Sequence, residues 1–195
     1  MTTPPLSGPV VPTAFVDANV LYPSELRSFL LYLHRTGAFR VRWSDRVHEE
    51  WTEALLRRRP DISREKLLRT RSLMEGTAPD ALVTGYEDRI ASLHLPDPHD
   101  RHILAAAIHY EADVIVTINL RDFPPAAVEP HGIVVMHPDQ FTISLWHRFS
   151  ELVVDAARDH RSSLQNPPRS QLEYLKVLAV QGMVETAAIL EFFDV

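Results

Sequence analysis

The chain has 195 residues, of which 45% are hydrophobic and 24% are charged, a composition typical of one soluble globular domain. The absence of cysteine excludes disulfides, thiolate metal sites and a cysteine nucleophile, and it fits a cytoplasmic protein. No apolar run reaches the roughly 18 residues of a membrane span, and the first residues lack the basic and apolar regions of a signal peptide. We therefore expect no membrane partner, and a poorly ordered, Pro-rich tail over residues 1–12.

The formal net charge of −6 is unevenly distributed along the chain. Residues 57–71, which we call the basic segment, contain seven basic and two acidic residues, so the other 180 residues carry −11. Such a segment either attracts phosphate groups or forms a solvated helix face. For the first interpretation, the candidate RNA-binding residues are Arg57, Arg58, Arg59 and Arg64.

The apolar pattern predicts strands that alternate with helices. Short apolar runs predict strands over 13–16, 39–43, 81–84, 113–117 and 133–136. Apolar residues three and four apart predict helices between them, over 24–35, from Ser44, over 63–75 and from Asp97. This alternation indicates a parallel sheet with helices on both faces, a three-layer α/β/α sandwich.

The pattern becomes purely helical after residue 138. Apolar residues at helical spacing predict helices around 145–156, 172–178 and 183–190, with a break at Asn166-Pro167-Pro168. We therefore expect an α/β domain over 13–138 and a C-terminal helical extension over 139–195.

Several polar residues follow the strands of the predicted sheet. Asp17 comes directly after the first strand, while Asn119 and Asp122 come after the strand that ends at Thr117. Functional groups gather beyond the carboxyl ends of parallel strands. An aspartate at the end of an apolar strand is also costly unless it is bound or hydrogen-bonded.

Three further carboxylates are expected at the same edge. Glu50 lies about six residues into the helix after the second strand, and Asp97 and Asp100 open the helix before the strand that ends at Thr117. Carboxylates that gather in this way cannot all stay ionised without a cation. Oxygen ligands without cysteine favour Mg²⁺ or Mn²⁺, and such ions assist phosphodiester hydrolysis.

Each candidate also has a purely structural interpretation. Asp97, followed by Pro98, has the pattern of a helix N-terminus. Glu50 could belong to a solvated helix face, and Asn119 and Asp122 are common turn residues. The histidines show no HExxH spacing, so we expect them on the surface or behind the site residues.

Four segments together resemble the PIN-domain family, in particular the VapC-type toxins. They comprise residues 15–21, 44–51, 97–107 and 116–124, in the family's order and spacing over roughly 13–138. The resemblance implies a flavodoxin-like PIN sandwich. It also implies an endoribonuclease that depends on Mg²⁺ or Mn²⁺ and is the toxin of a bacterial type II toxin–antitoxin module.

The resemblance also implies roles for particular residues. Asp17, Glu50 and Asp100 match the acidic positions that hold metal and catalyse cleavage, and the fourth position falls on Asn119 or Asp122. Many relatives carry aspartate where this chain has Asn119. Because of this departure, we assign Asp122 to the catalytic set. The supporting residues are Asn19, Asp97, Asn119 and Thr117.

The expected partners are an RNA substrate, an antitoxin that covers Asp17 and Asp100, and a second copy of the chain. The dimer is expected because residues 24–35 carry more apolar side chains than one core-facing stripe needs, and the extension adds Trp146, Phe149, Phe192 and Phe193. Two alternatives keep the fold: a PIN-type nuclease of RNA processing or DNA metabolism, and a non-catalytic interaction module. A haloacid-dehalogenase-type phosphatase would need a second acid at the position of Asn19, so the sequence argues against this class of enzyme.

Overall fold

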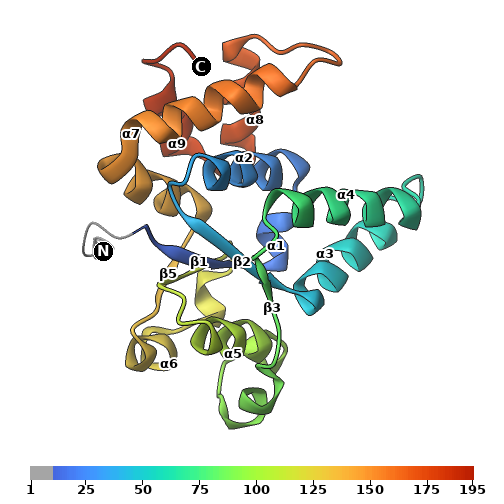
Figure 1. The fold of residues 1–195 in the computed structure, drawn as a ribbon, viewed down its shortest axis with the longest axis vertical. Helices are drawn as coiled ribbons and strands as arrows, with labels where there is room; N and C mark the ends of the chain where they lie inside the picture. Colours follow the sequence, from blue (N-terminus) through green and yellow to red (C-terminus); the bar gives the residue numbers. More distant parts are fainter. Residues whose placement is uncertain (1–10) are drawn as a thin grey trace.

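The computed structural model describes residues 11–195, in which the chain forms a five-stranded parallel sheet (Figure 1). The strand order is β3-β2-β1-β4-β5, and every neighbouring pair is parallel. The strands are β1 (Thr13–Val16), β2 (Arg40–Ser44), β3 (Leu82–Val83), β4 (Val114–Val116) and β5 (Val134–Met136). The predicted parallel sheet is thereby confirmed, although β3 has only two residues.

The central strand β1 and its neighbour β4 are buried throughout. Residues 14–16 of β1 and 114–116 of β4 have no exposed surface, as expected for strands covered on both faces. The register places Val16 beside Val116, so the residues that follow these two strands emerge next to each other.

Helices cover both faces of the sheet, as predicted. Figure 1 shows α2 (Ser24–Arg35) on one side and α5 (Arg101–His109) and α6 (Pro125–Val128) on the other. The short α1 (Ala18–Leu21) follows β1 directly, and short 3-10 turns lie at Glu87–Ser92, Pro98–Asp100, Leu120–Asp122 and Glu129–His131. Within the described residues, no helix is both long and apolar enough to cross a membrane.

Helices α3 (Asp45–Arg58) and α4 (Arg64–Thr77) form an arm that projects from the sheet (Figure 1). The predicted cap at Ser44 is present, because its side chain accepts a hydrogen bond from the backbone N–H of Val47 at 3.3 Å. Ser63 caps α4 in the same way through Lys66 at 3.2 Å. The basic segment therefore spans the tip of this arm.

The expected N-terminal tail lies mostly outside the described residues. At its last position the expectation is wrong, because Pro12 is buried and its carbonyl accepts a hydrogen bond from the backbone N–H of Arg40 at 2.8 Å. Pro12 thus extends the contact between β1 and β2.

The extension consists of α7 (Pro138–Ser163), α8 (Gln171–Val180) and α9 (Val184–Leu190). Helix α7 is interrupted at Phe149, whose backbone angles (φ −142°, ψ 50°) are not helical. Before the break, Phe141 packs edge-on against Phe39 of the α/β part, with ring centroids 5.0 Å apart. The buried carboxylate of Asp139 accepts two backbone N–H bonds at the start of α9, both at 2.8 Å. The Asp139 bonds thus hold the extension together, and the Phe141–Phe39 contact packs it onto the α/β part.

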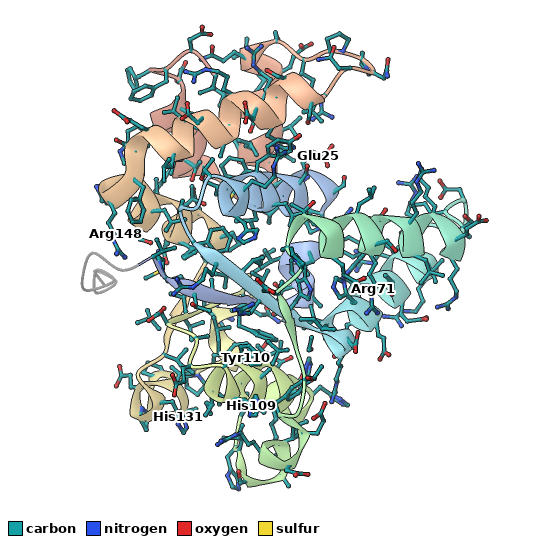
Figure 2. The ribbon with its side chains drawn as sticks, in the orientation of Figure 1. Glu25, Arg71, His109, Tyr110, His131 and Arg148 are labelled. Carbon is teal, nitrogen blue, oxygen red and sulfur yellow. The ribbon has the colours of Figure 1, made fainter. Side chains whose placement is uncertain are left out.

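The extension covers α2, which corrects the sequence-based argument for a dimer. Residues 26, 29, 30 and 33 of α2 are at most 2% exposed, and residues 31 and 32 are half-buried. Glu25 of α2, labelled in Figure 2, pairs with Arg169 of the extension at 3.2 Å. Helix α2 leaves no broad apolar face for a second copy. Exposed apolar surface lies instead at Phe192, which is 85% exposed.

Candidate active site

The site begins at the join between β1 and β4. Asp17 follows β1 and continues its ladder, donating its backbone N–H to the carbonyl of Val116 at 3.0 Å. Its side chain is buried, and Oδ2 accepts hydrogen bonds from the Thr117 hydroxyl at 2.7 Å and from Asn19 Nδ2 at 2.6 Å. Among the described side chains, none donates a hydrogen bond to Oδ1 of Asp17. One oxygen of this carboxylate is thus fixed, and the other has no such partner.

Asn19 and Thr117 connect the ends of both strands. Asn19 Oδ1 accepts the backbone N–H of Ile118 at 3.0 Å, and Asn19 Nδ2 lies 3.0 Å from the Thr117 hydroxyl oxygen. That oxygen also accepts the backbone N–H of Asn119 at 3.0 Å. The loop after β4 is therefore held against Asp17 by side chains that contribute no charge.

The pKa of Asp17 is raised above its ordinary value. Burial is the main cause, because it penalises the charged form, and the negative charge of Glu50 acts in the same direction. The hydrogen bond from the Thr117 hydroxyl and those from the backbone N–H groups of Asn19 and Ala18 oppose this rise. A cation beside Asp17 would supply the compensation that the protein only partly provides.

Asp100, at the end of the 3-10 turn before α5, has a second perturbed carboxyl. Burial, followed by the charges of Asp17, Asp122, Asp97 and Glu50, raises its pKa to about 7. The other four acids predicted to converge therefore lie within electrostatic range of Asp100.

Glu50 reaches the site from α3. Its Oε1 lies 3.2 Å from Arg46 Nε and 3.0 Å from His102 Nε2. The imidazole of His102 is buried in α5, and its contact with Glu50 lacks the alignment of a hydrogen bond. Sequence reasoning missed both neighbours. The four-residue spacing of Arg46 and Glu50 was a usable signal, whereas nothing local connects His102 with α3.

The remaining candidates lie at the rim. Asp97 caps the 3-10 turn at Pro98–Asp100 by accepting the backbone N–H of His99 at 2.8 Å, as its sequence pattern predicts. Asn119 is exposed, and its hydrogen bond to Thr117 uses only its backbone. Asp122 is half-buried, and its charge contributes to the raised pKa of Asp100. The geometry therefore favours Asp122 over Asn119 as the fourth site residue.

The donor atoms suit a hard divalent cation, because every acid of the site offers carboxylate oxygen and no thiolate is present. Within residues 11–195, however, no three His, Asp or Glu side chains converge on one point closely enough to hold an ion. The carboxylates are thus near one another without forming a closed coordination shell.

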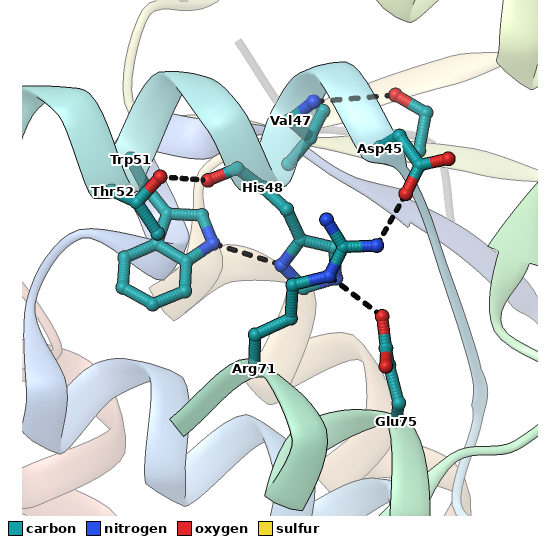
Figure 3. Close-up of polar contacts among 8 residues, drawn as sticks. Asp45, Val47, His48, Trp51, Thr52, Arg71 and Glu75 are labelled. Carbon is teal, nitrogen blue, oxygen red and sulfur yellow. Dashed lines mark hydrogen bonds and ion pairs between the residues drawn. The ribbon is translucent and has the colours of Figure 1, made fainter. Parts of the chain in front are cut away.

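A partly buried polar cluster fixes the helix that carries Glu50 (Figure 3). The indole N–H of Trp51 donates to His48 Nδ1 at 3.0 Å, and Arg71 of α4 pairs with Glu75 at 2.7 Å and with Asp45 at the start of α3. Burial, with a smaller contribution from Arg71, lowers the pKa of His48 to about 4, so this imidazole is neutral at pH 7. Arg71, labelled in Figure 2, thereby joins α4 to α3.

The arginines of the basic segment differ in their partners. Arg59 pairs with Asp61 at 2.6 Å and Arg64 pairs with Glu53 at 2.7 Å. These pairs support the solvated-face interpretation for Arg59 and Arg64. Arg57 and Arg58 line a pocket that also contains Glu50.

Comparison with known proteins agrees with this architecture. The PIN domain family matches residues 13–121, which is more than half of the chain, and the family described as VapC50 C-terminal domain matches residues 138–191. PIN-domain nucleases generally use divalent metal ions.

One similar protein is that of Mycobacterium tuberculosis named "Putative ribonuclease VapC50". It is 35% identical over 109 residues, which make up 54% of this chain and 64% of that protein. The match thus covers slightly less than two thirds of the relative's length. No solved structure matches the chain. Taken with the five-stranded parallel sheet and the acids at its edge, these matches show that the chain belongs to the PIN-domain family.

Proposed function

We propose that this protein is a metal-dependent endoribonuclease that hydrolyses RNA phosphodiester bonds. The observation that carries the proposal is the state of Asp100, whose pKa is raised to about 7 by burial and by four neighbouring acids. A half-buried group of acids is electrostatically unfavourable unless protons or cations neutralise it. The name of the M. tuberculosis relative, which contains the word ribonuclease, supports the choice of reaction.

Asp17, Glu50, Asp100 and Asp122 would hold Mg²⁺ or Mn²⁺. Bound there, the metal would lower the pKa of a water molecule and offset negative charge on the reacting phosphate. Asn19 and Thr117 orient Asp17 by bonding to only one of its oxygens. Arg46 and His102 restrict Glu50 from two sides.

We further propose that the protein is the toxin of a cytoplasmic toxin–antitoxin pair. An antitoxin segment laid over Asp17 and Asp100 would block the acids from RNA. A basic side chain in that segment would also compensate their charge, as a cation does. The support is the resemblance to VapC toxins and the match of the extension to the VapC50 C-terminal domain.

A homodimer remains part of the proposal, but its surface is moved from α2 to the extension. Three apolar residues of the extension are well exposed, namely Leu172 (59%) and Val180 (83%) on α8 and Val184 (59%) on α9. Together with Phe192 they form the exposed apolar surface that a second copy would cover.

The chemistry of the products tests the proposed reaction. A water nucleophile makes no use of the ribose 2′-hydroxyl, so the cleaved RNA should carry a monophosphate on one side of the break and a hydroxyl on the other. Mass spectrometry of the fragments distinguishes this outcome from a 2′,3′-cyclic phosphate. Cyclic phosphate products, or fragments produced equally in EDTA, would contradict the proposed hydrolysis.

A further inference from the structure

A pocket of about 450 Å³ lies between α1 and α3, immediately beside the carboxylates. Asn19 and Glu50 form its end nearest the acids, and Arg57 and Arg58 form the opposite end. Glu50 and Arg57 are seven residues apart on one helix, so about 10 Å separates the two ends along the helix axis. The pocket thus connects the site of cleavage with two cations.

Small side chains leave the middle of the pocket open. Ala54 occupies the position one turn after Glu50, and Ala18 faces it from α1. Tyr22 is half-buried and supplies an aromatic side wall. The volume lies within the range of about 300–1,000 Å³ that small organic ligands occupy.

The wall formed by Trp51 is held in place from two sides. Trp51 is 1% exposed, and its indole N–H bonds to His48. The guanidinium of Arg27 lies 4.7 Å from the centre of the Trp51 ring and donates to the carbonyl of Leu21 at 2.5 Å. A pocket with such a wall needs little rearrangement to accept a ligand, which lowers the cost of binding.

Arg57 and Arg58 are the cations of the arm that the pocket can use. Both are exposed, and neither forms an ion pair or hydrogen bond with any residue that the structure describes. By contrast, Arg59, Arg64 and Arg71 are already paired with acids. Unpaired guanidinium groups at one end of an aromatic-walled pocket suit a phosphate, because arginine presents several donors to its oxygens.

We propose that this pocket receives one unstacked base of single-stranded RNA, next to the phosphate that is cleaved. Tyr22 stacks on the base, Ala18 and Ala54 give it room, and Arg57 and Arg58 bind the phosphate on its far side. A base inside a duplex cannot enter the pocket without leaving its stack, so the pocket selects unpaired RNA. This inference rests on the proposed ribonuclease function for its substrate, but its test does not require cleavage.

The test measures binding of a fluorescent 12-nucleotide single-stranded RNA of mixed sequence, in EDTA so that no metal-dependent cleavage occurs. Ala54→Trp fills the pocket and should weaken binding at least tenfold. Ser72→Trp, which adds the same side chain at an exposed position of α4, should bind like the wild type. The residual binding of a 12-base-pair RNA duplex should not respond to Ala54→Trp.

A second pair of variants tests the cationic end and changes only exposed side chains. Arg57→Gln with Arg58→Gln should weaken binding and flatten the dependence of log Kd on log salt by about 0.7, the change expected when one phosphate contact is lost. Lys66→Gln with Arg69→Gln removes the same charge from α4 and should change the slope less. Two results would contradict the proposed base-binding pocket. One is an equal change of the salt dependence in both pairs of variants. The other is an Ala54→Trp variant that folds and binds single-stranded RNA as tightly as Ser72→Trp does.

The two proposals can fail separately. Cleavage by the wild type with Mg²⁺, together with an Ala54→Trp variant that binds and cleaves normally, would reject the pocket and keep the nuclease. Loss of binding in Ala54→Trp, together with no cleavage by the wild type, would keep the pocket and reject the nuclease.

Discussion

Thr117 donates its hydroxyl proton to Oδ2 of Asp17 at 2.7 Å, across the join between β4 and β1. The bond is buried, and it lowers the pKa of a carboxyl that burial raises. Thr117 is therefore a positioning residue, because it acts on the site through Asp17. Its neighbour Asn19 shares the task, since both donate to the same oxygen.

Replacing Thr117 tests this positioning role. Thr117→Val keeps the shape of the side chain but removes the donor, so the pKa of Asp17 should rise further. The pH at which cleavage reaches half of its maximum should then move upward, and the rate at pH 7 should fall about tenfold, which corresponds to about 1.4 kcal/mol. Thr117→Ser should restore both quantities. An unchanged pH profile in Thr117→Val would contradict the role.

Asp100 should destabilise the metal-free protein at neutral pH. Its pKa is about 7 in the folded chain against an ordinary value of 3.8, so the folded state binds more protons between these values. Stability therefore falls as the pH rises from about 4 to 7. Since Asp100 is only half-buried, we expect Asp100→Asn to raise the free energy of unfolding at pH 7 in EDTA by about 2 kcal/mol, after allowance for solvent screening. Urea titrations measure the change.

Two control measurements accompany the prediction for Asp100. Asp122→Asn should give a smaller gain, because Asp122 contributes only part of the shift at Asp100. Addition of Mg²⁺ should stabilise the wild type more than Asp100→Asn. Equal stability of wild type and Asp100→Asn in EDTA across pH 5–8 would show that Asp100 is not under electrostatic strain.

The extension contains a histidine with the opposite pH dependence. His160 is fully buried, lies 3.1 Å from the hydroxyl of Tyr174 through Nδ1, and packs against Tyr32 of α2. Burial lowers its pKa to about 4 from the ordinary value of 6.5. The unfolded chain therefore binds more protons between these values, and stability is lost as the pH falls from about 6.5 towards 4.

The predicted loss from His160 is on the order of 3 kcal/mol across this range. His160→Asn preserves a polar atom near the place of Nδ1 and does not titrate there. Comparison of urea midpoints at pH 7 and pH 5 should show a smaller decrease for His160→Asn than for the wild type. Identical decreases would place the acid sensitivity elsewhere, with buried His48 as the next position to examine.

The sheet and the position of Asp17 could be predicted from local sequence. Apolar runs of four or five residues identified β1 and β4, and an acid directly after a buried strand has few ordinary explanations. Parallel pairing then brings the carboxyl ends of these strands to one edge of the sheet. The pairing of Asp17 with Thr117 follows from the register that the structure shows.

Other features depend on contacts between distant segments. The contact between His102 and Glu50 joins α5 to α3, and the sequence of neither helix predicts it. The apolar side chains of α2 showed that the helix needs a partner surface, but not whether a second copy or this chain's own extension supplies it. Likewise, charge alone did not separate Arg57 from Arg59, because the difference lies in Asp61 pairing with only one of them.

The central claim is that Asp17 and a divalent metal together cleave RNA, and a single-turnover assay tests it most directly. Wild-type protein stripped with EDTA should leave single-stranded RNA intact and regain cleavage with Mg²⁺ or Mn²⁺. Asp17→Asn should stay inactive with either ion while melting no lower than the wild type in EDTA, because it relieves repulsion among the acids. Asp80→Asn, which removes an exposed acid far from the site in sequence, should cleave normally. Full cleavage by Asp17→Asn, or by the metal-free wild type, would contradict the account.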